Sequence, residues 1–159
     1  MLAHAVEGGE RFGAFDAALC ALHVGPALPP ARWAELVRAN LRPGGRFVVD
    51  LPAVEMIPDL SDAWREAGWD EEPLAALRGP SDVELVEALR GAGLRGVESA
   101  LGAHLLRAPS AADLVAGFAD DLGLDDDRAV ELVHGLVRLR RETGPLELLA
   151  HRAQASGRR

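Results

Sequence analysis

Apolar residues occur along the chain in short continuous runs that alternate with segments of helical spacing, a pattern typical of alternating strands and helices. The nearly unbroken apolar run 15–22 is followed by a glycine and three prolines within 23–30, so we predict a strand rather than a helix. A helical face then recurs over 31–41, Pro43-Gly-Gly turns the chain, and a β-branched strand follows over 46–51. Two apolar strands joined by a helix predict a parallel pair in a sheet that is covered on both faces.

The second half of the chain continues the alternation with helices in the majority. Ser81 and Glu84 have the spacing of a capping box, and Ser110 and Asp113 repeat that spacing further along the chain. We expect helices over about 60–67, from 82, from 111 and from 126, strands over 94–106 and 146–153, and a polar tail over 154–159. We find no internal repeat and no linker, so we expect 1–159 to be one domain with a helical insertion at about 109–144.

Composition excludes several classes of function. The 17 basic residues, all arginine, are outnumbered by 25 acidic ones, and a net charge of −8 argues against binding to nucleic acid. Cys20 is the only cysteine, which excludes an internal disulfide and a cysteine-based zinc site. No apolar run is long enough to span a membrane, and the N-terminus lacks the pattern of a secretory leader. We therefore expect a cytoplasmic protein without membrane partners.

Three motifs, in this order, carry a resemblance to a known family. Phe15-Asp-Ala-Ala-Leu-Cys-Ala-Leu-His resembles the fourth strand of class I S-adenosylmethionine-dependent methyltransferases. Leu41-Arg-Pro-Gly-Gly-Arg-Phe-Val-Val resembles the turn into their fifth strand, and Leu89-Arg-Gly-Ala-Gly-Leu-Arg-Gly-Val-Glu resembles the corner that follows. The resemblance covers about 10–155. It implies an α/β fold: the last strands of a partial Rossmann-like sheet, the final one antiparallel, with helices on both faces.

The resemblance also implies which residues would form a site. His23 would follow the strand beside the methionine part of the cofactor and could act as a catalytic base, or it could only bond to the backbone. The residues implied to contact S-adenosylmethionine are Phe12, Ala21, Leu22 and His23. The residues implied to line a pocket for a small-molecule acceptor, under a helical lid, are Trp64, Leu114 and Phe118. The alternative for Phe12 and for these three is ordinary core packing, and Asp50 could line the same crevice or cap its strand.

The chain departs from the family in its first part. The family's glycine-rich turn and the carboxylate that accepts the ribose hydroxyls should precede the fourth strand, and only 14 residues stand there. Gly8-Gly9 does not follow a strand, so it is not that turn. We therefore expect a methyltransferase of small-molecule type that is truncated at its N-terminus. The alternative is a non-catalytic remnant or accessory subunit, which would pair through its exposed sheet edge with a second copy or with a partner that supplies the missing half.

A metal site is not expected. The acidic stretch 120–127 lacks the alternating ligands and the distal glutamate of a calcium-binding loop. Helix capping explains its three consecutive aspartates, since a carboxylate is favourable at the start of a helix.

Overall fold

In the computed structural model, which describes residues 13–21, 28–141 and 144–159, four strands form one sheet with the order β1-β2-β4-β3. β1 runs parallel to β2, and β4 lies antiparallel to both β2 and β3. The elements follow one another as β1 (Phe15–Ala21), α1 (Pro30–Asn40), β2 (Leu41–Pro52), α2 (Pro58–Glu66), the 3-10 helix η1 (Glu72–Leu77), α3 (Asp82–Gly91), β3 (Arg95–Ala108), α4 (Ala111–Leu122), α5 (Asp126–Arg140) and β4 (Leu146–Arg158).

Side-chain caps confirm the predicted starts of α3, α4 and α5, whereas α1 and α2 begin without a side-chain cap. The Ser81 hydroxyl accepts a hydrogen bond from the Glu84 N–H while the Glu84 carboxylate accepts one from the Ser81 N–H, so the capping box is complete. Ser110 caps α4 through the Asp113 N–H at 3.1 Å. Asp125 caps α5 in the same way, which accounts for part of the acidic stretch through local helix physics.

The polar tail predicted over 154–159 is wrong, because β4 continues to Arg158. The segment lies between β2 and β3 and pairs with both of them. Ala153 and Ala155 are buried there, and small side chains of this kind are easily taken for a tail when their two neighbouring strands are unknown. The 3-10 helix at 72–77 was also not predicted.

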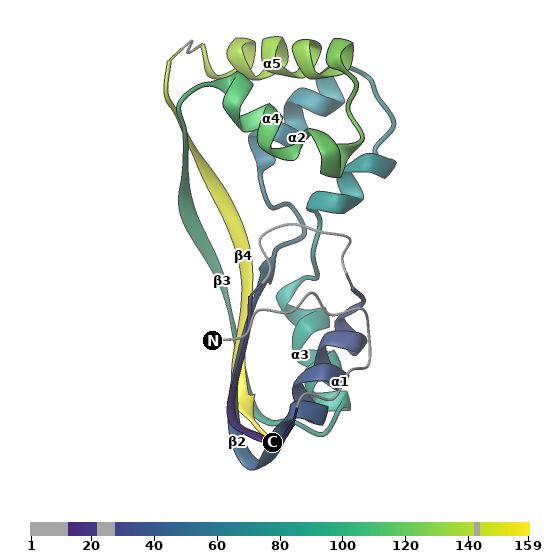
Figure 1. The fold of residues 1–159 in the computed structure, drawn as a ribbon, viewed down its shortest axis with the longest axis vertical. Helices are drawn as coiled ribbons and strands as arrows, with labels where there is room; N and C mark the ends of the chain where they lie inside the picture. The colour runs from purple at the N-terminus through teal and green to yellow at the C-terminus, as the bar shows by residue number, and fades with distance from the viewer. Residues whose placement is uncertain (1–12, 22–27, 142–143) are drawn as a thin grey trace.

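The molecule has two lobes along its long axis (Figure 1), each with its own apolar core. The sheet lobe consists of β1, α1, β2, α3 and the adjoining ends of β3 and β4. Its core residues on α1, β2 and α3 include Val37, Leu41, Val49, Leu51 and Leu85. The helical lobe consists of α2, η1, α4 and α5, packed on the first half of β4. Its core includes Leu60, Trp64, Phe118, Leu132 and Leu146.

The two lobes use opposite faces of β4. Leu146, Leu148 and Ala150 are buried towards the helical lobe, whereas Ala153 and Ala155 are buried in the sheet lobe. Successive side chains of a strand point to opposite faces, so the buried side chains change from one face of β4 to the other after Arg152. Helices thus pack on both faces of the sheet, as predicted. None of the helices in the described ranges has the length and apolar character that a membrane crossing requires.

Candidate functional site

The carboxyl ends of the parallel strands β1 and β2 meet at one level of the sheet. Ala21, the last residue of β1, is the register partner of Asp50 on β2. Val49 and Leu51 are buried in the core of the sheet lobe, so the Asp50 side chain lies on the opposite face, on the same side as Ala21. Ligands of open α/β sheets bind at the carboxyl ends of parallel strands, so this level of the sheet is the candidate binding region.

An ion pair holds Asp50 in place. The Arg152 Nε donates to Asp50 Oδ1 at 3.0 Å, and a terminal nitrogen of the same guanidinium donates to the Asp50 backbone oxygen at 3.0 Å. The Arg152 side chain is only 8% exposed, whereas the Asp50 side chain is 28% exposed. An ionised carboxylate can accept several hydrogen bonds, so the exposed part of Asp50 can still accept one from a hydroxyl or amino group.

The segment that follows β2 is tied down on two sides. The Ala53 N–H donates to the His151 oxygen at 3.1 Å, and the His151 N–H donates to the Met56 oxygen at 2.7 Å. On the other side, the Gly79 N–H donates to the Ala53 oxygen at 2.9 Å. The crossing is so close that a Cβ on Gly79 would lie 1.8 Å from the Pro52 oxygen. The strand end that carries Asp50 is therefore set in a rigid frame.

The residues implied by the family resemblance are only partly described. Phe12, Leu22 and His23 lie outside the described residues, and their assignments stay predictions. Ala21 is described and is exposed at the end of β1. The structure brings Trp64, Leu114 and Phe118 together, but as buried members of the helical core. A part in an acceptor pocket stays a prediction for these three residues.

Aromatic contacts explain why the two central tryptophans stay together. Trp64 donates its indole N–H to the Asp70 oxygen at 2.7 Å and meets Trp69 edge to face, with ring centroids 4.9 Å apart. The Arg128 guanidinium lies over the Trp69 ring at 5.6 Å. These contacts fix α2 and the segment after it against the start of α5, so their role is structural.

Cys20 and the acidic stretch offer no separate chemistry. Burial raises the pKa of the Cys20 thiol, so the thiol stays protonated at neutral pH and is a poor nucleophile. Within the described ranges, no group of three or more His, Cys, Asp or Glu side chains is arranged to hold a metal ion.

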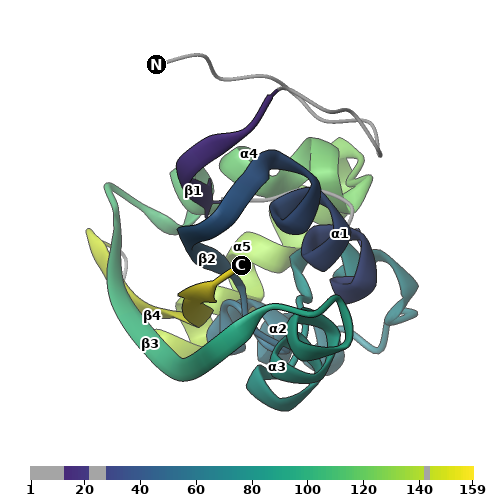
Figure 2. The same ribbon diagram turned by 90° about the horizontal axis from the view of Figure 1, so that it is seen from below.

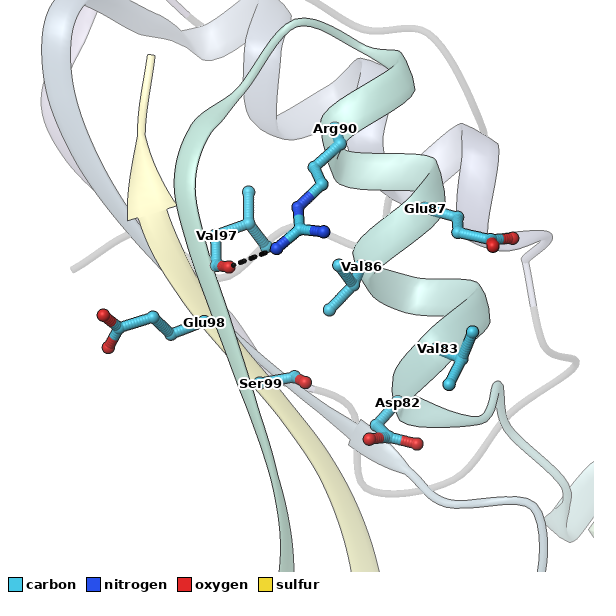
Figure 3. A pocket seen from close by; sticks show the side chains of 8 residues that line it. All are labelled: Asp82, Val83, Val86, Glu87, Arg90, Val97, Glu98 and Ser99. Carbon is cyan, nitrogen blue, oxygen red and sulfur yellow. Dashed lines mark hydrogen bonds between the residues drawn. The ribbon is translucent and has the colours of Figure 1, made fainter.

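A surface groove of about 490 Å³ lies between α3 and β3 (Figure 3). Val83 and Val86 of α3 line it together with Glu98 and Ser99 of β3, and Arg90 crosses it to donate to the Val97 oxygen at 3.3 Å. A second hollow lies beside α1 and Arg159. Neither hollow is lined by a residue of β1 or β2, so neither coincides with the carboxyl ends of the parallel strands.

Arg152 is the residue that sequence reasoning missed. It stands in the run Leu148-Leu-Ala-His-Arg-Ala of apolar and small residues, within the predicted strand 146–153. An arginine inside such a run is rarely buried without an acidic partner, and Asp50, already noted as a strand-end carboxylate, was available for that role. That combination was the signal in the sequence.

No family model matches the sequence, and no curated protein matches it either. Solved structures do resemble the fold. A candidate methyltransferase from Bacillus halodurans superposes with a TM-score of 0.57 at 13% identity, over 94% of this chain and 67% of that chain. The YcgJ protein from Bacillus subtilis gives a TM-score of 0.49 at 14% identity, over 95% of this chain and 68% of that chain. The [4+2]-cyclase SpnF gives 0.43 at 20% identity, over 98% and 52%.

At these identities the comparison supports the fold alone. That support comes from the first of the three structures, whose TM-score is 0.57. The similarity agrees with the observed sheet: a parallel pair, then two antiparallel pairs, with the last strand of the chain inserted between β2 and β3. The chain therefore has a fold similar to that of the class I methyltransferases.

Proposed function

We propose that the chain is the C-terminal part of a methyltransferase that uses S-adenosylmethionine and acts on a small-molecule acceptor. One observation carries the proposal: the strand order β1-β2-β4-β3, with one parallel pair followed by an inserted antiparallel last strand. The fold similarity to the Bacillus halodurans protein, described as a candidate methyltransferase, supports it.

In this proposal the acceptor binds beside Asp50, below the helical lobe. The Asp50 carboxylate would accept a hydrogen bond from a hydroxyl or amino group of the acceptor, while Arg152 keeps the carboxylate in one position. His23, which follows β1 in the sequence, would be the base that takes a proton from the acceptor. Alignment of the acceptor would supply most of the rate, as expected for in-line transfer between two bound molecules.

The residues present fit only part of a cofactor site. A glycine-rich turn would let the backbone approach the cofactor, and an acidic strand end would bind its ribose, but no segment of the 159 residues matches these two features. For the cofactor the chain offers the exposed end of β1 at Ala21, and the partly exposed carboxylate of Asp50 is assigned to the acceptor. We therefore expect the chain alone to bind S-adenosylmethionine weakly or not at all, and a further segment to complete the site.

Two measurements test the proposal. Calorimetry of the purified chain with S-adenosylmethionine should show no binding. Micromolar binding would contradict the proposal that a further segment is needed to complete the cofactor site. The coding sequence directly upstream of Met1 should then be read for an in-frame Asp-x-Gly-x-Gly stretch. If this stretch is present, the longer chain should bind the cofactor. The Asp50→Asn variant of the longer chain should keep that binding and lose acceptor methylation, and a longer chain without cofactor binding would refute the assignment.

A second candidate function is that of an accessory subunit, and the exposed edge strand β1 favours it. β1 pairs only with β2 in the described part of the sheet, and Leu19 is 68% exposed beside the half-exposed Val48. Such an apolar edge tends to pair with another strand. In this case a separate protein with the glycine-rich turn would bind through β1. Leu19→Glu should abolish that complex. A complex that survives the substitution would show that the partner does not bind through β1.

A further inference from the structure

In the described residues the opposite edge of the sheet is also without a further strand. β3 is the outer strand, and β4 is its one partner in the described part of the chain (Figures 1 and 2). Between Glu98 and Arg107 the strand reads Ser-Ala-Leu-Gly-Ala-His-Leu-Leu, with no carboxylate, arginine or proline. Charges and prolines are the usual means by which an edge strand avoids further pairing, so this edge is open to another strand.

Three exposed leucines lie together on one face of β3 and β4, and we call them the leucine patch. Leu101 and Leu105 of β3 are 66% and 52% exposed, and their spacing of four residues puts them on the same face. Leu149 of β4 is the register partner of Leu105 and is 52% exposed. The helical lobe packs on the other face, through Leu148, so it leaves the patch uncovered.

The pattern along β3 is self-complementary. Two antiparallel copies of a strand are related by a twofold axis perpendicular to the sheet, which keeps each face on its own side. With the axis at Ala103, Leu101 stands opposite the partner's Leu105, and Leu105 stands opposite the partner's Leu101. Moving the axis by one residue places Leu101 opposite the partner's Ala103 or the partner's Arg107 instead.

Charge does not oppose the antiparallel direction. The edge has a carboxylate at one end, Glu98, and a guanidinium at the other, Arg107, which is 73% exposed although it pairs with Glu147 at 2.8 Å. With the axis at Ala103, Glu98 stands opposite the partner's Ala108, and Arg107 stands opposite the partner's Ser99. Like charges, which are unfavourable when they face each other in a sheet, are therefore kept apart.

We infer that a second copy of this chain is the partner of β3: two copies pair antiparallel through this edge with the twofold axis at Ala103. The two four-stranded sheets become one continuous sheet, and the two leucine patches merge across the axis. The inference does not depend on the proposed methyltransferase activity, and it uses the edge opposite to β1.

Cysteine cross-linking tests the register. In the Cys20→Ala background, Ala103→Cys places two thiols directly opposite each other, where Cα atoms of antiparallel strands lie about 4.5–5.5 Å apart, within disulfide range. Mild oxidation should give a covalent dimer. The matched control Leu101→Cys lies on the same strand and face but about 13 Å from its symmetry mate, and should stay monomeric. A mixture of the Leu101→Cys and Leu105→Cys chains should cross-link.

Sedimentation of the intact chain tests the interface itself. The unmodified chain should sediment as a dimer, Leu101→Arg as a monomer, and Leu19→Glu, on the other edge, still as a dimer. Circular dichroism should show unchanged folding for Leu101→Arg, because Leu101 is mostly exposed. A monomeric unmodified chain, a dimer lost in Leu19→Glu but kept in Leu101→Arg, or equal cross-linking through Leu101→Cys would each overturn the inference.

Discussion

Gly79→Ala is expected to be the most damaging single-methyl addition among the glycines of the described segments. Gly79 lies where the segment before α3 crosses the end of β2, and its N–H donates to the Ala53 oxygen at 2.9 Å. A Cβ would stand 1.8 Å from the Pro52 oxygen and 2.7 Å from the Pro52 carbonyl carbon. Both of these are backbone atoms, so no side chain can rotate away to make room.

The expected cost follows from these distances. An ordinary contact needs about 3.4 Å or more, so one backbone segment must move by well over an ångström. Overpacking of this kind costs about 1–3 kcal/mol, and the loss of the hydrogen bond to Ala53 adds about 1 kcal/mol. We expect Gly79→Ala to lower the free energy of unfolding by about 2–4 kcal/mol and Tm by about 4–16 °C.

The assay is urea unfolding followed by circular dichroism, with Gly117→Ala as the control. Gly117 lies inside α4, and a Cβ there meets nothing within 4 Å. Alanine is the better helix former by about 0.5–1 kcal/mol, so the control should be stabilised. If Gly79→Ala unfolds at the same urea concentration as the unmodified chain, the close crossing at Pro52 is wrong, and so is the rigid frame around Asp50.

Three further outcomes are expected from the same unfolding assay. Hydrogen bonds from neighbouring arginines lower the pKa of Glu71, and those from the α3 cap lower the pKa of Glu84; their stabilisation is complete above the unfolded pKa of about 4.3 and is lost as the pH falls through the folded values. The free energy of unfolding should therefore decrease on acidification, and Glu84→Gln should flatten the decrease; an unchanged pH profile would refute this. Arg152→Met should cost about 1–3 kcal/mol, because it leaves the partly buried Asp50 carboxylate without its guanidinium partner, and adding Asp50→Asn should recover part of the loss in a double-mutant cycle. Leu132→Ala should cost about 2–5 kcal/mol by opening a cavity in the helical core, and a cost near zero would mean that this core is not packed as described.

Local signals in the sequence were sufficient wherever the controlling interaction is local. The capping box of Ser81 and Glu84 joins groups three residues apart, so its spacing alone predicts the start of α3. The apolar run 15–22 and the strand pattern that follows Pro43-Gly-Gly, a segment that the structure includes in β2, likewise predicted the parallel pair. The resemblance of three motifs, in their order along the chain, was enough to indicate the class I methyltransferase-like fold, even though no family model matches.

Pairing across the sheet could not be obtained in this way. The segment 154–158 has no strand pattern of its own, and it is a strand because β2 and β3 offer hydrogen bonds on both of its sides. The sequence pattern around Trp64, Leu114 and Phe118 is the same whether they line a pocket or fill a core. The packing of α2 and α4 against α5 buries them.

The sequence by itself determined most of the helices, three of their caps and the parallel strand pair, because each depends on periodicity or on groups a few residues apart. The expected fold class was implied by the resemblance of three motifs to those of a known family. The tertiary structure alone decided that Arg152 meets Asp50 at the carboxyl end of β2, and that the leucine patch on β3 stays uncovered. The physical reason is distance along the chain. Asp50 and Arg152 are 102 residues apart, and only the insertion of β4 between β2 and β3 brings their charges within 3.0 Å.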